Sequence, residues 1–284
     1  MKQIKRPVEI LVLSDIHLGT YGCHAKELVK YLKSIKPAKV ILNGDIIDIW
    51  QFSKNYWPKS HMKVIKIFLQ WGTRGVKTHY ITGNHDEMLR KFSGFKMGSI
   101  RIENKVVLDI LEDKKVWIFH GDVFDVTMQH SKWLAKLGSV GYDFLILINK
   151  AVNFISEVIF KKGKLSFSKK IKNNVKSAVK FINGFEKTAA DIAIANNYDF
   201  VICGHIHQPE IKTIETNKGK VIYMNSGDWI ENLTALEFNN GQWSIYKYDE
   251  DRLINNSNHD DMEELDNSEL FDNMLKEFNI MKIV

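Results

Sequence analysis

Side chains of the kinds that bind divalent metal ions follow several short apolar stretches of this sequence. The stretches cover residues 8–13, 39–42, 78–81, 116–119 and 200–202, and the side chains that follow them are Asp15, His17, Asp45, Asn84, His120, His205 and His207. A short apolar run that ends abruptly in polar residues predicts a buried strand that leads into a loop. Loops that leave the carboxyl ends of strands form the sites of open α/β sheets, so we expect these seven side chains to converge.

The chemistry of this set points to two metal ions. Asp15 and His17 are two residues apart, which in extended backbone puts both side chains on one face. The set combines carboxylate, amide and imidazole donors without a thiolate, which suits Mn²⁺, Fe or Zn²⁺ better than a structural zinc site. Seven donors suffice for two ions that share one carboxylate, and such ions lie about 3.5–4 Å apart and clamp both oxygens of a phosphoryl transfer. The predicted chemistry is therefore phosphoester hydrolysis by metal-activated water.

The elements between these stretches are mostly helical. Residues 25–35 have helical spacing that stops before Pro37, and a second helix is expected over residues 59–71. A sixth apolar run, residues 220–223, leads into a loop that contains Gly227 and Asp228. Five of the six loops carry a glycine, which is useful where the backbone turns sharply or comes close to a bound ion.

Residues 123–187 interrupt this alternation and are predicted to form a helical cap insertion. They hold long apolar segments, with twelve lysines against four acidic residues. The apolar run is shorter than the roughly 20 residues that a bilayer span needs. We interpret it as an interfacial or ligand-covering helix pair; the alternative is ordinary core helices packed on the sheet.

Composition indicates one large domain, residues 1–248, followed by an acidic and mobile tail, residues 249–284. The chain has 284 residues, of which 44% are hydrophobic, so it can bury a full core. Eleven acidic residues stand against three basic ones in the tail, which leaves +14 on residues 1–248. So basic a body favours an anionic partner: nucleic acid, a phospholipid surface or a phosphorylated substrate. Cys23 and Cys203 fit no disulfide framework and no apolar signal segment opens the chain, which favours the cytoplasm.

The ordered motifs resemble those of the calcineurin-like metallophosphoesterases. They are Asp15-Ile16-His17, Gly44-Asp45-Ile46-Ile47-Asp48, Gly83-Asn84-His85-Asp86, His120-Gly121-Asp122 and Gly204-His205-Ile206-His207. The resemblance implies an α/β (α+β) four-layer sandwich of two mixed β-sheets flanked by helices. It also implies that Asp15, His17 and His207 bind one metal ion, that Asn84, His120 and His205 bind the other, and that Asp45 bridges both. His85 would meet the scissile phosphate and help the leaving oxygen depart, with Asp86 orienting its ring.

Within that family, the chain length and the insertion after His120-Gly121-Asp122 resemble the UDP-2,3-diacylglucosamine diphosphatases of lipid A synthesis. This resemblance implies a Mn²⁺-dependent pyrophosphate hydrolase that releases UMP and works at the inner-leaflet membrane surface. The chain carries His85 where the best-known branch has arginine, and its sequence around Gly227 and Asp228 also differs, so it resembles a sister branch.

Three alternatives remain at this stage. The substrate could be another lipid-linked or nucleotide phosphoester. A cyclic-nucleotide or nucleic-acid phosphodiesterase is less favoured, because the insertion lacks the interleaved arginine and aromatic residues of a strand-tracking groove. A non-catalytic scaffold with this fold is disfavoured by the complete donor set. Asp48 and Asp122 could act as residues that brace the ligands or the loops.

Overall fold

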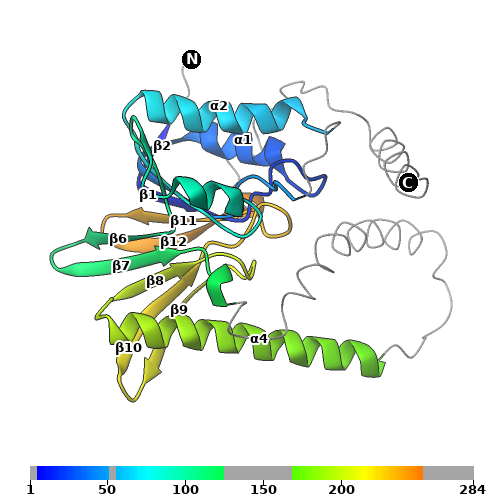
Figure 1. Ribbon diagram of the computed structural model, residues 1–284, viewed down its shortest axis with the longest axis vertical. Helices are drawn as coiled ribbons and strands as arrows, with labels where there is room; N and C mark the ends of the chain where they lie inside the picture. The colour runs from blue at the N-terminus through cyan, green and yellow to red at the C-terminus, as the bar shows by residue number, and fades with distance from the viewer. Residues whose placement is uncertain (1–4, 51–55, 125–167, 252–284) are drawn as a thin grey trace.

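A computed structural model describes residues 5–50, 56–124 and 168–251, and within residues 168–180 only the backbone. Four layers follow one another in it: a pair of helices, a first sheet, a second sheet and a long helix (Figure 1). The paired helices are α1 (Ala25–Ser34) and α2 (Lys59–Thr73), and the long helix is α4 (Ser168–Ala195). This is the predicted sandwich of two mixed sheets flanked by helices.

The first sheet has seven strands and holds the first three metal-binding motifs. In spatial order its strands are β12 (Gln242–Lys247), β11 (Thr234–Asn239), β1 (Arg6–Leu13), β2 (Ile35–Asn43), β3 (Lys77–Ile81), β5 (Ile100–Glu103) and β4 (Lys96–Met97). Strands β1, β2, β3 and β5 run parallel, while β4, β11 and β12 pair antiparallel. The carboxyl ends of β1, β2 and β3 therefore lie at one edge of this sheet.

The second sheet has five strands and holds the other two motifs. In spatial order these are β6 (Lys105–Ile110), β7 (Lys114–Phe119), β8 (Phe200–Cys203), β10 (Gly219–Asn225) and β9 (Glu210–Thr216). Strands β7, β8 and β10 are parallel, with β6 and β9 antiparallel at the two edges. Short 3₁₀ segments complete the described elements: η1 (Glu87–Phe92), η2 (Asp122–Phe124) and η3 (Tyr248–Glu250).

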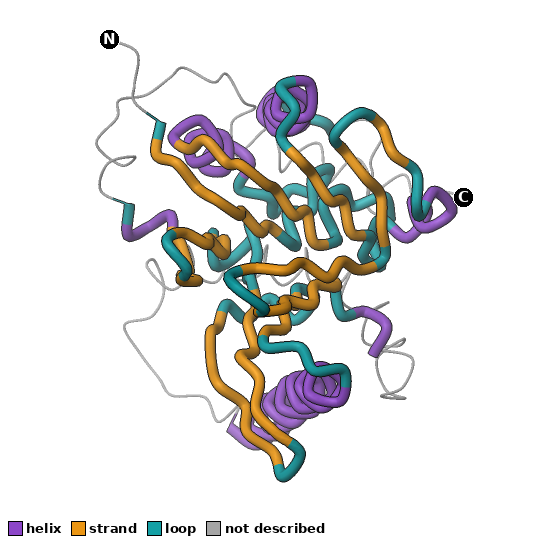
Figure 2. The backbone as a smooth tube through the Cα atoms, turned by 90° about the vertical axis from the view of Figure 1, so that its left-hand side faces the viewer, coloured by secondary structure: helices purple, strands orange, loops and turns teal. Residues whose placement is uncertain are grey.

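Burial on both faces explains the continuous apolar runs of the central strands. In β1, Leu11 and Leu13 pack in the core beneath α1 and α2, while Ile10 and Val12 pack in the core between the sheets. A strand covered on both faces has no polar face to alternate with, so its sequence is apolar throughout. Figure 2 shows the two sheets facing each other, with helices on the outer side of each.

Strand β2 begins earlier than the sequence suggested and includes Pro37. Proline has no backbone N–H to donate to a neighbouring strand. It is accommodated here because this part of β2 pairs only with β1, where Val8 is opposite Pro37, and pairing with β3 starts at Lys39. Helix α1 accordingly ends at Ser34.

The outer face of the second sheet is covered by α4. Phe185, Ala189, Ala190 and Ala193 of this helix are buried against that sheet, and the small size of the three alanines lets the helix lie close. Residues 168–187 of the predicted insertion are the first part of α4, whereas residues 125–167 lie outside the described residues. The same holds for residues 252–284 of the predicted tail. None of the helices in the described ranges is long and apolar enough to cross a membrane.

Candidate metal centre

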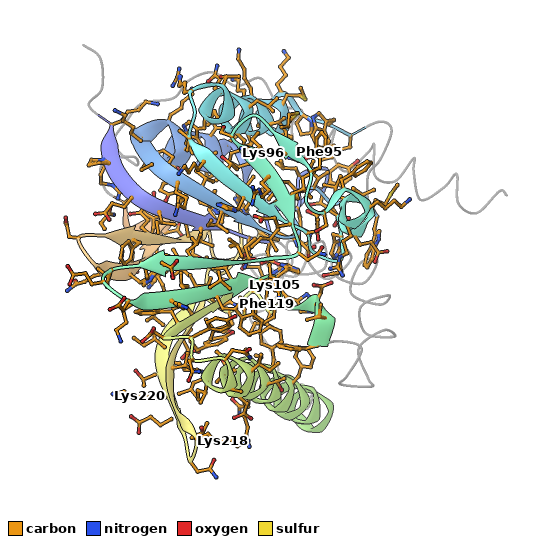
Figure 3. All side chains as sticks on the ribbon, turned by 60° about the vertical axis from the view of Figure 1, so that its left-hand side comes forward. Phe95, Lys96, Lys105, Phe119, Lys218 and Lys220 are labelled. Carbon is orange, nitrogen blue, oxygen red and sulfur yellow. The ribbon has the colours of Figure 1, made fainter. Side chains whose placement is uncertain are left out.

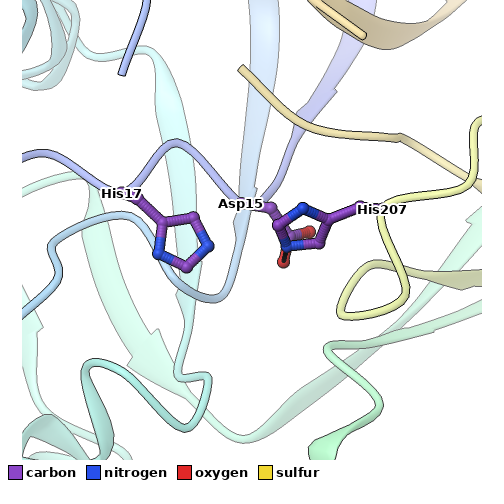
Figure 4. A group of neighbouring side chains, drawn as sticks. All are labelled: Asp15, His17 and His207. Carbon is purple, nitrogen blue, oxygen red and sulfur yellow. Dashed lines mark ion pairs between the residues drawn. The ribbon is translucent and has the colours of Figure 1, made fainter. Parts of the chain in front are cut away.

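The first candidate metal-binding group joins the two sheets. Asp15 and His17 follow β1, His207 follows β8, and their ligand atoms all lie within 4.8 Å of one another. The imidazole Nε2 of His207 is 3.2 Å from Asp15 Oδ1. Figure 4 shows Asp15 and His17 on one loop and His207 coming to Asp15 from another. Asp15 is fully buried, so its charge needs compensation by a cation.

The second group lies on the loops after β2, β7 and β8. Asp45, His120 and His205 present ligand atoms within 4.8 Å of one another, and His120 Nε2 is 3.1 Å from Asp45 Oδ2. The backbone N–H of His85 donates to Asp45 Oδ1 at 2.8 Å, which brings the Asn84–His85 peptide to the same carboxylate. The structure thus brings the predicted donors together at the carboxyl ends of the strands.

The donor atoms are oriented as metal ligands require. The Nδ1 of His120 donates to the carbonyl oxygen of Asn43 at 2.8 Å, and the Nδ1 of His17 is 3.2 Å from Asp48 Oδ2. Each of these bonds leaves the lone pair of Nε2 free for a cation. The Nε2 of His17 and the Oδ1 of Asn84 are buried and have no hydrogen-bond partner in the structure. Because unsatisfied buried polar atoms are rare and costly, this donor set fits divalent metal ions.

The backbone of the predicted ligands is strained. Asp15, His17, Asp45, His205 and His207 have φ angles of 51°, 53°, 54°, 67° and 53°. Each such residue costs on the order of 1–3 kcal/mol and persists only where its surroundings hold it, which is typical of functional sites. The surroundings here are neighbouring loops: the N–H of Asp15 donates to the Gly44 carbonyl at 3.1 Å, and that of His17 to the Asp45 carbonyl at 2.9 Å.

Two motif glycines make this close approach possible. Gly44 has a φ of +80°, and a Cβ on it would overlap the ring of His120. A Cβ on Gly83 would overlap the carboxylate of Asp45. These glycines are therefore required because the side chains of two predicted metal ligands occupy the space of their missing Cβ atoms.

The sequence model of the calcineurin-like phosphoesterases matches residues 8–209, which span all five motifs. The chain belongs to this family. It is similar to UDP-2,3-diacylglucosamine hydrolases of Blochmanniella pennsylvanica (24% identical, covering 82% of this chain and 92% of the relative) and Aliivibrio fischeri (25%, covering 84% and 98%). Among solved structures, the phosphoesterase YfcE of E. coli matches 84% of this chain and 92% of its own, with 12% identity and a TM-score of 0.42. This metallophosphoesterase is accordingly a hydrolase, and its family implies divalent metal ions.

The calcineurin-like phosphoesterase site carries an excess of negative charge. Burial lowers the pKa of His207, but the Asp15 carboxylate outweighs burial and raises the pKa of His207 to about 9. Burial raises the pKa of Asp45, but the neighbouring charges of His120 and His85 hold the pKa of that carboxyl well below its usual range. Histidines that retain protons this strongly mark a site whose carboxylates require cations.

Asp48 connects a predicted metal ligand to the predicted catalytic histidine of this phosphoesterase. Its Oδ2 is 3.2 Å from Nδ1 of His17 and 2.7 Å from Nδ1 of His85. Burial raises the pKa of Asp48, but its bonds to the two imidazoles outweigh burial and keep that pKa low. Burial lowers the pKa of His85, but Asp48 and Asp45 outweigh it and raise that pKa above its ordinary value. Asp48 therefore favours the protonated form of His85 and pairs with its ring.

Asp86 does not orient the ring of His85 as the sequence suggested. Its carboxylate accepts hydrogen bonds from the backbone N–H of Gly83 at 2.6 Å, from the N–H of Ile46 at 3.0 Å and from the Tyr80 hydroxyl at 2.7 Å. Gly83 belongs to the same turn as Asp86, whereas Ile46 lies in the loop after β2. These donors satisfy the carboxylate of Asp86, and the ring of His85 pairs with Asp48 instead. Burial and the charge of Asp45 raise the pKa of Asp86. Asp86 thus fixes the loop that carries Asn84 and His85.

A further carboxylate supports His207, and the sequence analysis assigned it no role. Asp228 is fully buried, accepts from the N–H groups of Ile230 at 2.8 Å and Glu231 at 2.5 Å, and lies 4.0 Å from Nδ1 of His207. The amide of Asn232 donates to Asp228 at 2.5 Å and to the carbonyl of His207 at 2.9 Å. The sequence signal was available, since Asp228 follows the sixth apolar strand as the other acidic residues follow theirs.

Asp122 forms an ion pair with Arg90. This pair connects η2 to η1.

Proposed function

We propose that this phosphoesterase hydrolyses UDP-2,3-diacylglucosamine to UMP and 2,3-diacylglucosamine 1-phosphate. The observation that carries the chemistry is the meeting of two ligand groups, Asp15/His17/His207 and Asp45/His120/His205, beside His85, which pairs with Asp48. The choice of substrate is supported by the curated relatives of that name, which match 82–84% of the chain. The proposed chemistry and the proposed substrate both agree with the resemblance of the motifs and of the insertion to the UDP-2,3-diacylglucosamine diphosphatases.

In this proposal two sets of residues bind two divalent ions, and Mn²⁺ is the expected metal. Asp15, His17 and His207 would hold one ion, Asn84, His120 and His205 the other, and Asp45 both. When bound, the ions supply Lewis acidity and lower the pKa of a water molecule.

His85 is the residue proposed to act on the phosphate itself. Its imidazole would face the negative charge that develops on the phosphate oxygens, and its protonated form would donate a proton to the leaving oxygen. Asp48 maintains the charge and the direction of that ring. A water molecule adds to one phosphorus of the pyrophosphate, and the bond from that phosphorus to the bridging oxygen breaks.

The location that suits such a substrate is the cytoplasmic face of the inner membrane. A diacylated sugar nucleotide stays at the lipid surface, so a cytoplasmic enzyme has to associate there peripherally. The net charge of +14 on residues 1–248 favours association with anionic headgroups. Residues 123–187 are proposed to cover the acyl chains; residues 125–167 of this segment lie outside the described residues.

The test is release of UMP from purified enzyme with Mn²⁺ and UDP-2,3-diacylglucosamine, measured by chromatography. UDP-N-acetylglucosamine serves as the matched control because it has the same pyrophosphate but no long acyl chains. We expect UMP from the acylated substrate only, and none from the His85→Ala variant. Hydrolysis of bis(p-nitrophenyl) phosphate without any UMP release would retain the chemistry and refute the substrate, in favour of another lipid-linked or nucleotide phosphoester.

A further inference from the structure

Four large apolar side chains are exposed within ten residues of one another, directly after the catalytic loop. Met88, Phe92, Phe95 and Met97 have exposed fractions of 55%, 54%, 56% and 56%. All residues from 91 to 98 belong to the exposed class. Single exposed apolar side chains are ordinary, whereas a contiguous group marks an interaction surface. We refer to residues 88–97 as the 88–97 patch.

The patch is held in a defined backbone conformation. The N–H of Gly94 donates to the Ile102 carbonyl at 2.8 Å, and the N–H of Ile102 donates to the Phe95 carbonyl at 3.0 Å. Phe95 also donates to the Phe92 carbonyl at 2.9 Å, and β4 pairs with β5 through Lys96 and Arg101. These hydrogen bonds and the pairing of β4 at the edge of the first sheet fix the backbone of the patch. The exposure of its apolar side chains is therefore a property of the folded chain.

Basic side chains accompany the apolar ones. Lys91 and Lys96 are exposed within the patch, and Glu87 is the acidic residue next to it. Aromatic and methionine side chains mixed with lysines are typical of segments that lie in the headgroup region of anionic bilayers. Protein–protein interfaces are instead depleted of lysine. The composition of the patch therefore favours a lipid surface over a protein partner.

The patch adjoins the site. Met88 is three residues beyond His85 in the chain, and Trp50, itself 46% exposed, lies with its ring 4.7 Å from the ring of His85. A surface bound here would therefore lie next to the place where the scissile phosphate is proposed to bind.

We infer that the 88–97 patch docks this enzyme on an anionic phospholipid bilayer. Phe92, Phe95 and Met97 enter the boundary between headgroups and acyl chains, and Lys91 and Lys96 contact lipid phosphates. The inference deepens the proposed function by naming the surface that meets the membrane, and it rests on that function only for the reason why docking is useful.

The first experiment measures binding of the full chain to sedimented vesicles of phosphatidylcholine and phosphatidylglycerol. The variant Phe92→Ser/Phe95→Ser should weaken vesicle binding by roughly tenfold or more, because two aromatic side chains no longer enter the bilayer. The matched control is Met62→Ser/Leu69→Ser on α2, whose side chains are 54% and 47% exposed. Vesicle binding by the control should stay within twofold of the unmodified chain.

The second experiment tests the charges. Lys91→Glu/Lys96→Glu should weaken binding to these vesicles by at least about fivefold per lysine. The control is Lys218→Glu/Lys220→Glu at the hairpin between β9 and β10. Figure 3 shows these lysines at the opposite end of the molecule from Phe95 and Lys96. The control has the same change in net charge, so it separates a local contact from a general electrostatic attraction.

Equal losses in the patch and control variants would overturn the inference, as would failure of the unmodified chain to bind the vesicles. Unchanged hydrolysis of bis(p-nitrophenyl) phosphate by the patch variants shows that they fold. Vesicle binding that depends on the patch, together with no UMP release, would refute the proposed substrate and leave the docking surface in place. UMP release without patch-dependent vesicle binding would support the proposed substrate and refute the docking surface.

Discussion

The substitution Asp48→Asn tests the catalytic arrangement most selectively, because it keeps the shape of the side chain and removes its charge. Nδ1 of His85 lies 2.7 Å from Oδ2 of Asp48, and a charged contact of this kind is worth about 1.5–3 kcal/mol. At 1.36 kcal/mol per tenfold in rate, its loss should lower kcat by roughly 10- to 150-fold. Asp48 also contacts His17 at 3.2 Å, so the Mn²⁺ concentration for half activity should rise by about tenfold or more.

The assay is hydrolysis of bis(p-nitrophenyl) phosphate at saturating Mn²⁺ over a range of pH. Because Asp48 helps to raise the pKa of His85, its neutralisation should lower that pKa. The alkaline limb of the kcat profile should therefore move to lower pH. Asp199→Asn is the control, since Asp199 pairs with Lys114 at the surface, and its kcat should stay within twofold. An Asp48→Asn enzyme with unchanged kcat and an unchanged alkaline limb would refute the role assigned to Asp48.

Three further predictions concern the metal centre. His120→Ala should reduce turnover by about a thousandfold or more and remove bound metal, as measured by assay and elemental analysis; full metal content would contradict its role as a ligand. Gly44→Ala should lower the free energy of unfolding by more than about 2 kcal/mol, because the added Cβ overlaps His120. Gly94→Ala is the control: Gly94 also has a positive φ but lies in open space, so its replacement should cost about 1 kcal/mol. Denaturant titration measures both values, and equal losses would contradict the steric explanation. Metal-free protein should lose stability as the pH rises from about 6.5 to about 9, because the pKa of His207 is raised to about 9 in the folded chain. The stabilisation from its proton is complete below about 6.5 and is lost as the pH passes about 9. An unfolding free energy that stays constant over this pH range in the presence of chelator would contradict the pairing of His207 with Asp15.

The metal centre was predictable from the sequence because its donors occupy short motifs at strand ends. Residues such as Asp15 and His120 directly follow apolar runs, so their convergence depends only on parallel strands whose carboxyl ends meet. The family's sequence model, which matches residues 8–209, agrees with that reasoning. Two of the three Asp/His groups in the described part of the chain consist of predicted ligands.

Contacts made across loops were less predictable. Asp48 and Asp86 both lie near His85, and the sequence order favoured Asp86, which is its immediate neighbour. The carboxylate of Asp86 is instead satisfied by Gly83 and Ile46, so the ring turns to Asp48. No local pattern distinguishes two acidic residues whose roles depend on which backbone donors come within reach.

The edge strands were missed for a different reason. The sequence analysis sought continuous apolar runs, and β6 alternates instead: Val106, Leu108 and Ile110 are buried while Val107 is 40% exposed. Such alternation is itself a strand signal, for a sheet with one covered face. The 88–97 patch gave no signal either, because phenylalanine and methionine near a strand are ordinarily taken as core residues.

The central claim is that distant loops hold two divalent metal ions, and elemental analysis of active protein purified without chelators tests it most directly. We predict close to two equivalents of divalent metal per chain, with activity lost on chelation and restored by Mn²⁺. Full phosphodiesterase activity in protein that holds substantially less than two equivalents would contradict the account.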